Sequence, residues 1–318
     1  MKLLLKHVFS KFTLVMLATL YFSGIASAKD LVIMTSLPSM EFPFFVHMQN
    51  MLDQEAKSIG GIKILSADGQ NRVPKQTADV ESAIIQGVDG IIISPIDVNA
   101  MAPALQQAID AGIPVVTVDR YVGGVPGIYA HVGADNVKGG EAQARLIMKQ
   151  FPNGATIVNL QGQPGASPAI DRNKGLHNIL DGKSKYKIVA EQTANWSRDQ
   201  GMSVTENILV GLSSPPDVIN GANDDMALGA MEAVKARGLN VKILGFDALP
   251  EAIAAVRDGS LMATVEQFPG GQAKTALNLL VNDLRSSMKP YNRVISLNPI
   301  TITSENYRKN AERIGEVK

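Results

Sequence analysis

Two stretches of the same design decide the fold: Pro114-Val115-Val116-Thr117-Val118-Asp119-Arg120 and Val241-Lys242-Ile243-Leu244-Gly245-Phe246-Asp247. In each stretch a short apolar run predicts a buried strand, and polar residues follow directly at its end. In open α/β sheets a ligand lies in the crevice beyond the carboxyl ends of the strands. We therefore expect the two strand ends to form facing walls of one cleft between two sheets.

Further apolar runs recur roughly every 20 to 30 residues, which is the rhythm of a parallel sheet built from βαβ units. The run Gly90-Ile91-Ile92-Ile93 lacks polar alternation, as expected of a strand covered on both faces. The predicted fold class is α/β, with two doubly wound parallel sheets. Strands are expected to begin near Leu31, Ile62, Gly90, Pro114, Tyr129, Ala155, Tyr186, Pro216, Val241 and Met262.

Helical periodicity fills the intervals between these runs. Ser167 and Asp224 are typical of residues that begin helices, whereas Gly60 and Gly238 suit helix ends. The apolar positions of one expected helix share a single face: Phe45, Met48, Leu52 and Ala56.

The N-terminus predicts export. Three lysines precede an apolar run over residues 12–22, and Ala26-Ser27-Ala28 supplies the small residues that signal peptidase requires. About eleven apolar residues are too few for a membrane anchor, since a spanning helix needs about 20. We expect a signal peptide over residues 1–28, cleaved after Ala28, and a soluble protein in the periplasm of a Gram-negative cell.

Composition narrows the function classes. The chain carries 30 basic and 30 acidic side chains, and Lys2, Lys6 and Lys11 lie in the leader, which gives the mature chain a net charge of −3. Because there is no basic excess, no nucleic-acid partner is expected. Since the chain has no cysteine, neither a lipid-modified N-terminus nor a disulfide framework is possible. The remaining 290 residues suggest two domains.

Signatures of catalysis, metals and cofactors are lacking. The four histidines are scattered, and the sequence has no HExxH pair. It also has no G-x-S-x-G elbow, Walker loop or G-x-G-x-x-G turn. We therefore predict no enzyme activity, no metal and no cofactor.

An ordered set of motifs resembles the periplasmic sugar-binding proteins of ABC importers, specifically the ribose-binding type. The resemblance covers essentially all of residues 29–300. The motifs are Phe42-Pro43-Phe44-Phe45, Val118-Asp119-Arg120, Asp135-Asn136-Val137 with Gly139-Gly140, Leu160-Gln161-Gly162, Asp171-Arg172 with Gly175, Asn223-Asp224-Asp225-Met226-Ala227-Leu228-Gly229, Gly245-Phe246-Asp247 and Gln267.

The resemblance implies a periplasmic binding protein of type I, with two lobes joined by a hinge that the chain crosses three times. The N-terminal lobe would hold residues 29–134 plus 268–297, and the C-terminal lobe residues 135–267 plus 298–318. A sugar would bind between the lobes, and closure would let the membrane permease recognise the loaded form. A chemoreceptor is a further possible partner, and a monomer is expected.

A sugar requires hydrogen-bond partners around its ring edge and aromatic planes against its faces. A buried hydroxyl left unpaired costs about 1 to 3 kcal/mol. Carboxylates can accept from adjacent hydroxyls, guanidinium groups can donate, and amides can do both. The expected ligand-binding residues are Ser36, Phe44, Phe45, Ser94, Asp119, Arg120, Arg172, Trp196, Asn223, Phe246, Asp247 and Gln267.

Several of these residues also fit a purely structural role. Phe45 continues the buried face of its helix, the two aspartates could cap the segments that follow them, and Arg172 could lie on a solvated helix face. Either Asn223 or Asp224 could begin its helix while the other faces the cleft, and the resemblance favours Asn223 for the cleft.

Two departures from the family pattern leave the ligand open. Ser94 stands where the family commonly carries Asn, and Phe42 replaces an amide. Both changes remove polar contacts from the N-terminal lobe, although Gln163 could restore one from the other lobe. The prediction is therefore a pentose, a hexose or a related polyol.

Two other function classes share parts of this pattern. A regulator of the lac-repressor type would need an N-terminal helix-turn-helix, where this chain carries an export signal. A two-carboxylate glycosidase would need one acid in an apolar pocket and one in a solvated site, and the sequence indicates neither. A sugar-sensing module for a chemoreceptor or regulator is the alternative to transport.

Overall fold

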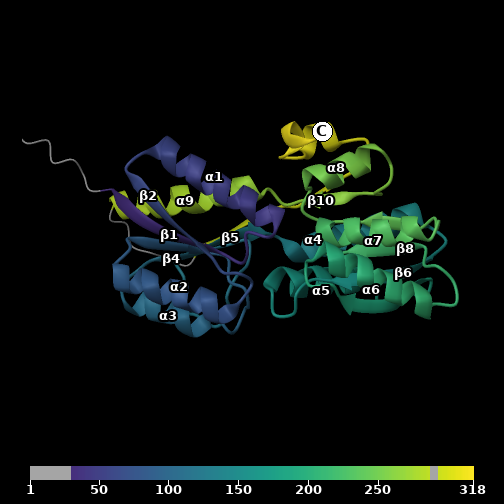
Figure 1. Cartoon of the computed structure of the whole chain (residues 1–318), viewed down its shortest axis with the longest axis horizontal. Helices are drawn as coiled ribbons and strands as arrows, with labels where there is room; N and C mark the ends of the chain where they lie inside the picture. Colours follow the sequence, from purple (N-terminus) through teal and green to yellow (C-terminus); the bar gives the residue numbers. More distant parts are fainter. Residues whose placement is uncertain (1–29, 287–292) are drawn as a thin grey trace, which may run out of the picture.

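The protein is described from a computed structural model that covers residues 30–286 and 293–318. Two sheets lie side by side along the long axis, each covered by helices (Figure 1). We name the six-stranded sheet with its helices lobe 1, and the four-stranded sheet with its helices lobe 2. The predicted signal peptide falls outside the described residues.

Lobe 1 is built on a parallel sheet in the order β11-β5-β4-β3-β1-β2. Its helices are α1 (Pro43–Ile59), α2 (Val73–Gln86), α3 (Ala102–Asp110) and α9 (Pro269–Ser286). Its strands are β1 (Leu31–Leu37), β2 (Ile62–Asp68), β3 (Gly90–Ile93), β4 (Val115–Val118), β5 (Ala130–Ala134) and β11 (Arg293–Leu297).

The uniformly apolar strand β3 is covered on both faces, as its sequence predicts. Ile92 belongs to the cluster that includes α1 and α9, whereas Ile91 and Ile93 belong to the cluster that includes α2 and α3. These helix pairs cover opposite faces of the sheet (Figure 1). Alternate side chains of a strand point to opposite faces, so a strand buried on both sides must be apolar throughout.

Lobe 2 is built on a second parallel sheet in the order β7-β6-β8-β9. Its strands are β6 (Ala155–Gln161), β7 (Tyr186–Thr193), β8 (Val218–Gly221) and β9 (Lys242–Leu244). Its helices are α4 (Asn136–Gln150), α5 (Ser167–Leu180), α6 (Arg198–Gly211), α7 (Asp224–Ala236) and α8 (Pro250–Arg257).

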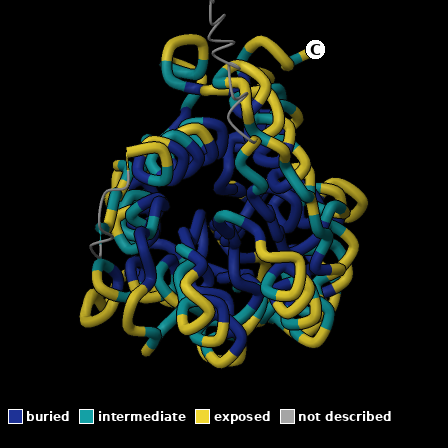
Figure 2. Tube along the Cα trace, turned by 90° about the vertical axis from the view of Figure 1, so that its left-hand side faces the viewer, coloured by how far each residue is buried: buried dark blue, intermediate teal, exposed yellow. Residues whose placement is uncertain are grey.

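The chain passes between the two sheets three times, from β5 to α4, from β10 (Thr264–Glu266) to α9, and from β11 to β12 (Ile300–Ile302). Strands β10 and β12 pair antiparallel beside lobe 2. The chain ends in the short helix α10 (Tyr307–Asn310) and a 3₁₀ turn, η1 (Ile314–Glu316), near α8. Buried segments form the interior and exposed segments the periphery in the view along the long axis (Figure 2).

The ten predicted strands are confirmed, and β11 and β12 are additions to them. Gly60 ends α1 with φ +74°, as expected. Ser167 differs from the prediction because it is the first residue of α5, after Ala166, and its side chain does not cap that helix. Asn223 caps α7 by accepting from Met226 N, so the helix begins one residue after the cap, at Asp224. Within the described ranges no helix is both long and apolar enough to span a bilayer.

Candidate functional site

A pocket with about 360 Å³ of empty space, solvent at its mouth included, lies between the two lobes. It is lined from both sides, and most of its lining residues are aromatic or charged. The lining residues are Phe42, Phe44, Phe45, Asp119, Arg120, Pro168, Arg172, Trp196, Asn223, Asp225, Asp247 and Gln267.

Nine of the twelve predicted residues line this pocket, and Ser36, Ser94 and Phe246 do not. Ser94 donates to Asp119 Oδ2 at 3.4 Å, so it supports a lining residue from below. Phe246 lies under the Arg172 guanidinium, whose carbon is 3.6 Å from the ring centroid. Ser36 is fully buried in β1, and its hydroxyl has no hydrogen-bond partner among the described residues.

The lobe 1 wall is formed where β4 ends. Asp119 and Arg120 are both buried, and Arg120 Nε lies 3.8 Å from Asp119 Oδ2. Arg120 also donates from Nη1 to the Ile96 carbonyl at 3.3 Å. Burial raises the pKa of Asp119 although Arg120 and Arg172 oppose the shift, and burial lowers the pKa of Arg120 to about 10. This wall therefore presents a carboxyl group beside a cation.

The lobe 2 wall is formed beyond the end of β9. Asp247 accepts from Gln267 Nε2 at 2.6 Å and from Arg172 Nη1 at 3.3 Å through the same oxygen, Oδ1. The pKa of Asp247 is raised to about 7, mainly by burial; Arg172 opposes this shift and nearby Asp119 contributes to it. The oxygen Oδ2 is thus left to face other partners in the pocket.

Arg172 is fixed on α5 by three groups besides Asp247. It donates from Nε to Asn136 Oδ1 at 2.8 Å and from Nη1 to the Ala222 carbonyl at 2.6 Å, and it stacks on Phe246. Only 4% of the residue is exposed, so a role on a solvated helix face is wrong for Arg172. A guanidinium held in this way is a preorganised donor.

A second acid, Asp224, holds the loop that carries Asp247. Its carboxyl accepts from Leu249 N at 2.8 Å and from Thr264 Oγ1 at 2.7 Å, and Thr264 in turn accepts from Ala248 N at 3.1 Å. Asp224 is fully buried, and burial raises its pKa well above the ordinary value. It supports the wall without lining the pocket.

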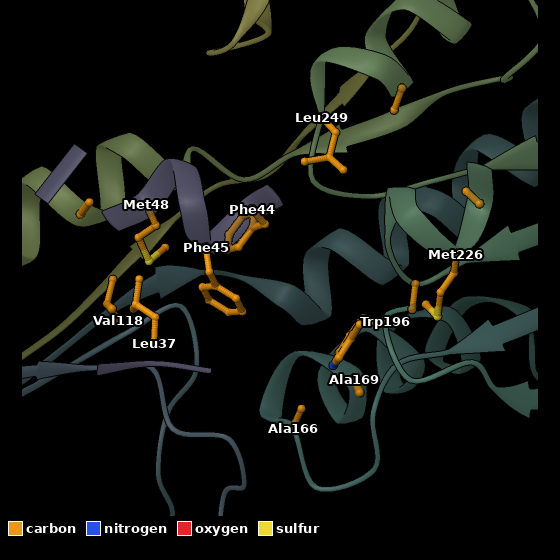
Figure 3. Packing of buried hydrophobic residues seen from close by; sticks show 14 of the residues in the cluster. Leu37, Phe44, Phe45, Met48, Val118, Ala166, Ala169, Trp196, Met226 and Leu249 are labelled. Atoms are coloured by element: carbon orange, nitrogen blue, oxygen red, sulfur yellow. The ribbon is translucent and has the colours of Figure 1, made fainter. Parts of the chain in front are cut away.

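Aromatic rings approach the pocket from both lobes. Figure 3 shows Phe44 and Phe45 on α1 and Trp196 on the opposite side, in the turn between β7 and α6. Trp196 lies against Gly162, where an added Cβ would be 2.1 Å from the indole ring. Phe45 is both core and pocket lining, so its two predicted roles coincide. Flat rings on opposite walls suit a ligand with two apolar faces.

Several buried polar atoms of the lining have no hydrogen-bond partner among the described residues: Arg120 Nε, Trp196 Nε1 and Gln267 Oε1. An unpaired buried polar atom costs about 1 to 3 kcal/mol, so a ligand rich in hydroxyl groups would remove that cost. The pocket therefore offers both donors and acceptors.

The sequence did not indicate Pro168 and Asp225 as lining residues. Phe42 also lines the pocket, although the sequence analysis considered it only as a replacement for an amide side chain. Asp225 lies in the first turn of α7, where acidic residues are common for helix reasons alone. Its carboxylate accepts from Arg198 Nη2 at 3.4 Å, and Arg198 also pairs with Glu251. The run Asn223-Asp224-Asp225 could have indicated Asp225, since the capping residue Asn223 and the first turn of α7 lie at the same end of the helix.

No group of His, Cys, Asp and Glu suited to a metal ion occurs in the described part of the chain.

Comparison with known proteins gives a match to the periplasmic binding protein domain over residues 33–286. The chain belongs to this family. The ribose import binding protein of Bacillus subtilis is 40% identical over 251 residues, which cover 78% of this chain and 79% of that protein.

Solved structures agree with this membership. The Caulobacter myo-inositol binding protein bound to myo-inositol is 44% identical, with a TM-score of 0.87 over 90% of this chain and 97% of that one. A solute binding protein of Bacillus halodurans with bound myo-inositol is 29% identical, with a TM-score of 0.84 over 89% and 98%. The predicted type I fold and the predicted ribose-binding-type family of ABC importers are confirmed.

Proposed function

We propose that this chain is a periplasmic receptor that closes its lobes around one six-membered cyclic polyol or monosaccharide and delivers it to an ABC transporter permease. The observation that carries the proposal is the convergence of charged groups from both lobes on one pocket. A ligand that contacts both lobes stabilises the closed arrangement, because only there are all its contacts made.

We place the lobe boundaries at residues 134/135, 267/268 and 297/298. Each lies in or beside one of the three segments that connect the two sheets. Motion about these segments changes the distance between Asp119 and Asp247 while leaving each sheet intact.

A cyclitol such as myo-inositol suits the pocket best. A cyclitol carries a hydroxyl on every ring carbon, and the lining supplies three carboxyl groups and two guanidinium groups around its edge. The 44% identity to a structure with bound myo-inositol supports the same choice.

Titration calorimetry on the mature protein, residues 29–318, tests the proposal. The panel is myo-inositol, scyllo-inositol, D-ribose, D-glucose, D-galactose and glycerol. We expect one binding site, with the highest affinity for an inositol. Tightest binding of D-ribose would overturn the choice of a cyclitol, and absence of binding to every member would overturn the proposed function.

Export is proposed from the leader and is supported by the periplasmic relatives of the family. Mass spectrometry of the protein from a periplasmic extract should give the mass of a chain that begins at Lys29. A mass that retains residues 1–28 would contradict cleavage after Ala28.

A further inference from the structure

A row of direct contacts joins the lobes outside the pocket. Tyr121 of lobe 1 donates from its backbone N to Ser167 Oγ at 3.0 Å, and from its hydroxyl to Asp171 Oδ1 at 3.3 Å. Both acceptors lie on α5 of lobe 2. None of these three residues lines the pocket.

A backbone contact extends the row. Val98 N, in the loop after β3, donates to the Gly165 carbonyl in the loop before α5 at 2.8 Å. Gly165 has φ +82°, and a Cβ there would lie 1.9 Å from Asp97 Oδ2 of lobe 1. The two loops therefore approach closely, and the positive φ favours glycine at this position.

The contacts use polar groups that would have no partner in the other lobe if the lobes were apart. Ser167 is only 1% exposed, and α5 has no side-chain cap, so this hydroxyl serves the other lobe instead of its own helix. Opening the lobes would return the Tyr121 hydroxyl, the Tyr121 N–H and the Ser167 hydroxyl to water. Each hydrogen bond thus exists only when the lobes are closed.

The sequence neighbours of these residues explain their importance. Tyr121 directly follows Arg120, and Asp171 directly precedes Arg172, and both arginines line the pocket. The contact row therefore lies one residue away from the ligand-facing groups of each lobe. It strengthens closure without touching what is enclosed.

We propose that Tyr121, Ser167 and Asp171 form a clasp that sets the closing equilibrium of the lobes and raises the affinity for every ligand by the same factor. This inference rests on the proposed capture of a ligand between the lobes. Apparent affinity scales with the fraction of protein in the binding-competent state, so a change in closure alone multiplies every dissociation constant equally.

The test compares wild type, Tyr121→Phe and Ser167→Ala by calorimetry and stopped-flow with every panel member that binds wild type. The loss of one hydrogen bond should weaken binding of each ligand roughly three- to tenfold, with faster release, unchanged ratios between ligands and an unchanged melting temperature. Tyr307→Phe on α10 is the matched control, because among the described residues the Tyr307 hydroxyl only accepts a hydrogen bond, from Arg308 Nε at 3.0 Å, and this variant should bind as wild type does.

The outcomes separate the clasp from the proposed function. If wild type binds no member of the panel, the proposed function fails. If wild type binds a ligand and both clasp variants bind it with wild-type affinity, the clasp is refuted. If Tyr121→Phe changes the ratio of affinities between two ligands, Tyr121 acts on the ligand itself and the proposal is also refuted.

Discussion

Asp119 and Asp247 share an uncommon backbone geometry, with φ of +61° and +111°. L-residues rarely adopt these values, and such strain costs on the order of 1 to 3 kcal/mol. Strand-end hydrogen bonds hold both residues in place, from Asp119 N to Val132 O at 2.9 Å and from Asp247 N to Val265 O at 2.8 Å. Both carboxyl groups are thereby held at the pocket, as a preorganised site requires.

Removal of Asp247 or Arg172 should weaken ligand binding severely. In Asp247→Ala or Arg172→Ala we expect a loss of at least about 2 kcal/mol of binding free energy, because a buried partner is left without its hydrogen bond. Calorimetry with the best panel ligand measures the loss. Wild-type affinity in either variant would remove that residue from the site.

The raised pKa of Asp247 predicts a pH-dependent stability of the ligand-free protein. Its carboxyl keeps a proton up to about pH 7 when folded but loses it near its ordinary pKa of 3.8 when unfolded. Its contribution to stability is therefore complete below about pH 4 and is lost as the pH rises to about 7. In Asp247→Asn this loss should be absent.

Urea unfolding at pH 5 and pH 8 checks the sign. The free energy of unfolding of Asp247→Asn minus that of wild type should increase by about 2 to 3 kcal/mol between pH 5 and pH 8, because stability changes by about 1.4 kcal/mol for each of the roughly two pH units below the folded pKa. An unchanged or decreasing difference would show that Asp247 is already ionised in the folded protein at pH 5.

At the scale of elements, glycines set how closely α4 and α5 approach. A Cβ at Gly140 would lie 2.0 Å from the Arg172 carbonyl oxygen, and a Cβ at Gly175 would lie 2.0 Å from the Val137 carbonyl oxygen. Because both obstacles are backbone atoms, neither can move aside without separating the helices. The position of Arg172 in the pocket thus depends on two glycines outside it.

Gly140→Ala should destabilise the protein and weaken binding together. Overpacking of this kind costs about 1 to 3 kcal/mol, and the shift of α5 would displace Arg172. Thermal unfolding and calorimetry measure the two effects. Gly211→Ala at the end of α6 is the control, because a Cβ there meets nothing within 4 Å, and it should leave both properties near wild type. Equal behaviour of the two variants would contradict the packing argument.

Elements with strong apolar runs could be predicted from the sequence, whereas the weaker edges could not. Strand β3 is apolar at every position because helices cover both its faces. Strand β11 lies at the edge of its sheet, with an exposed Val294, and β12 pairs only with β10. Neither has the apolar run by which the other strands are recognised.

At the scale of the molecule, the strand-end rule predicted Asp119 and Asp247 at one cleft, and both residues line the pocket, because parallel strands of both sheets end there. The rule could not indicate Asp225, since a first-turn acid has an ordinary explanation in its own helix. It also could not indicate Tyr121 and Ser167, whose contact depends on how two lobes meet. No local sequence pattern predicts how the two lobes meet.

Closure should be visible in solution. Trp196 is the only tryptophan and lines the pocket, so ligand binding should change its fluorescence. Small-angle scattering of the same samples should show a smaller radius of gyration with ligand, because the lobes approach each other. A proven ligand that leaves both quantities unchanged would contradict capture by closure.

The central claim is that the ligand lies between the lobes, and a crystal structure of the protein with the tightest panel ligand tests it most directly. We predict one ring in the pocket, with oxygens of Asp119 and Asp247 within hydrogen-bond distance of its hydroxyls and Trp196 against one face. A ligand bound anywhere else, or held by one lobe alone, would contradict the account.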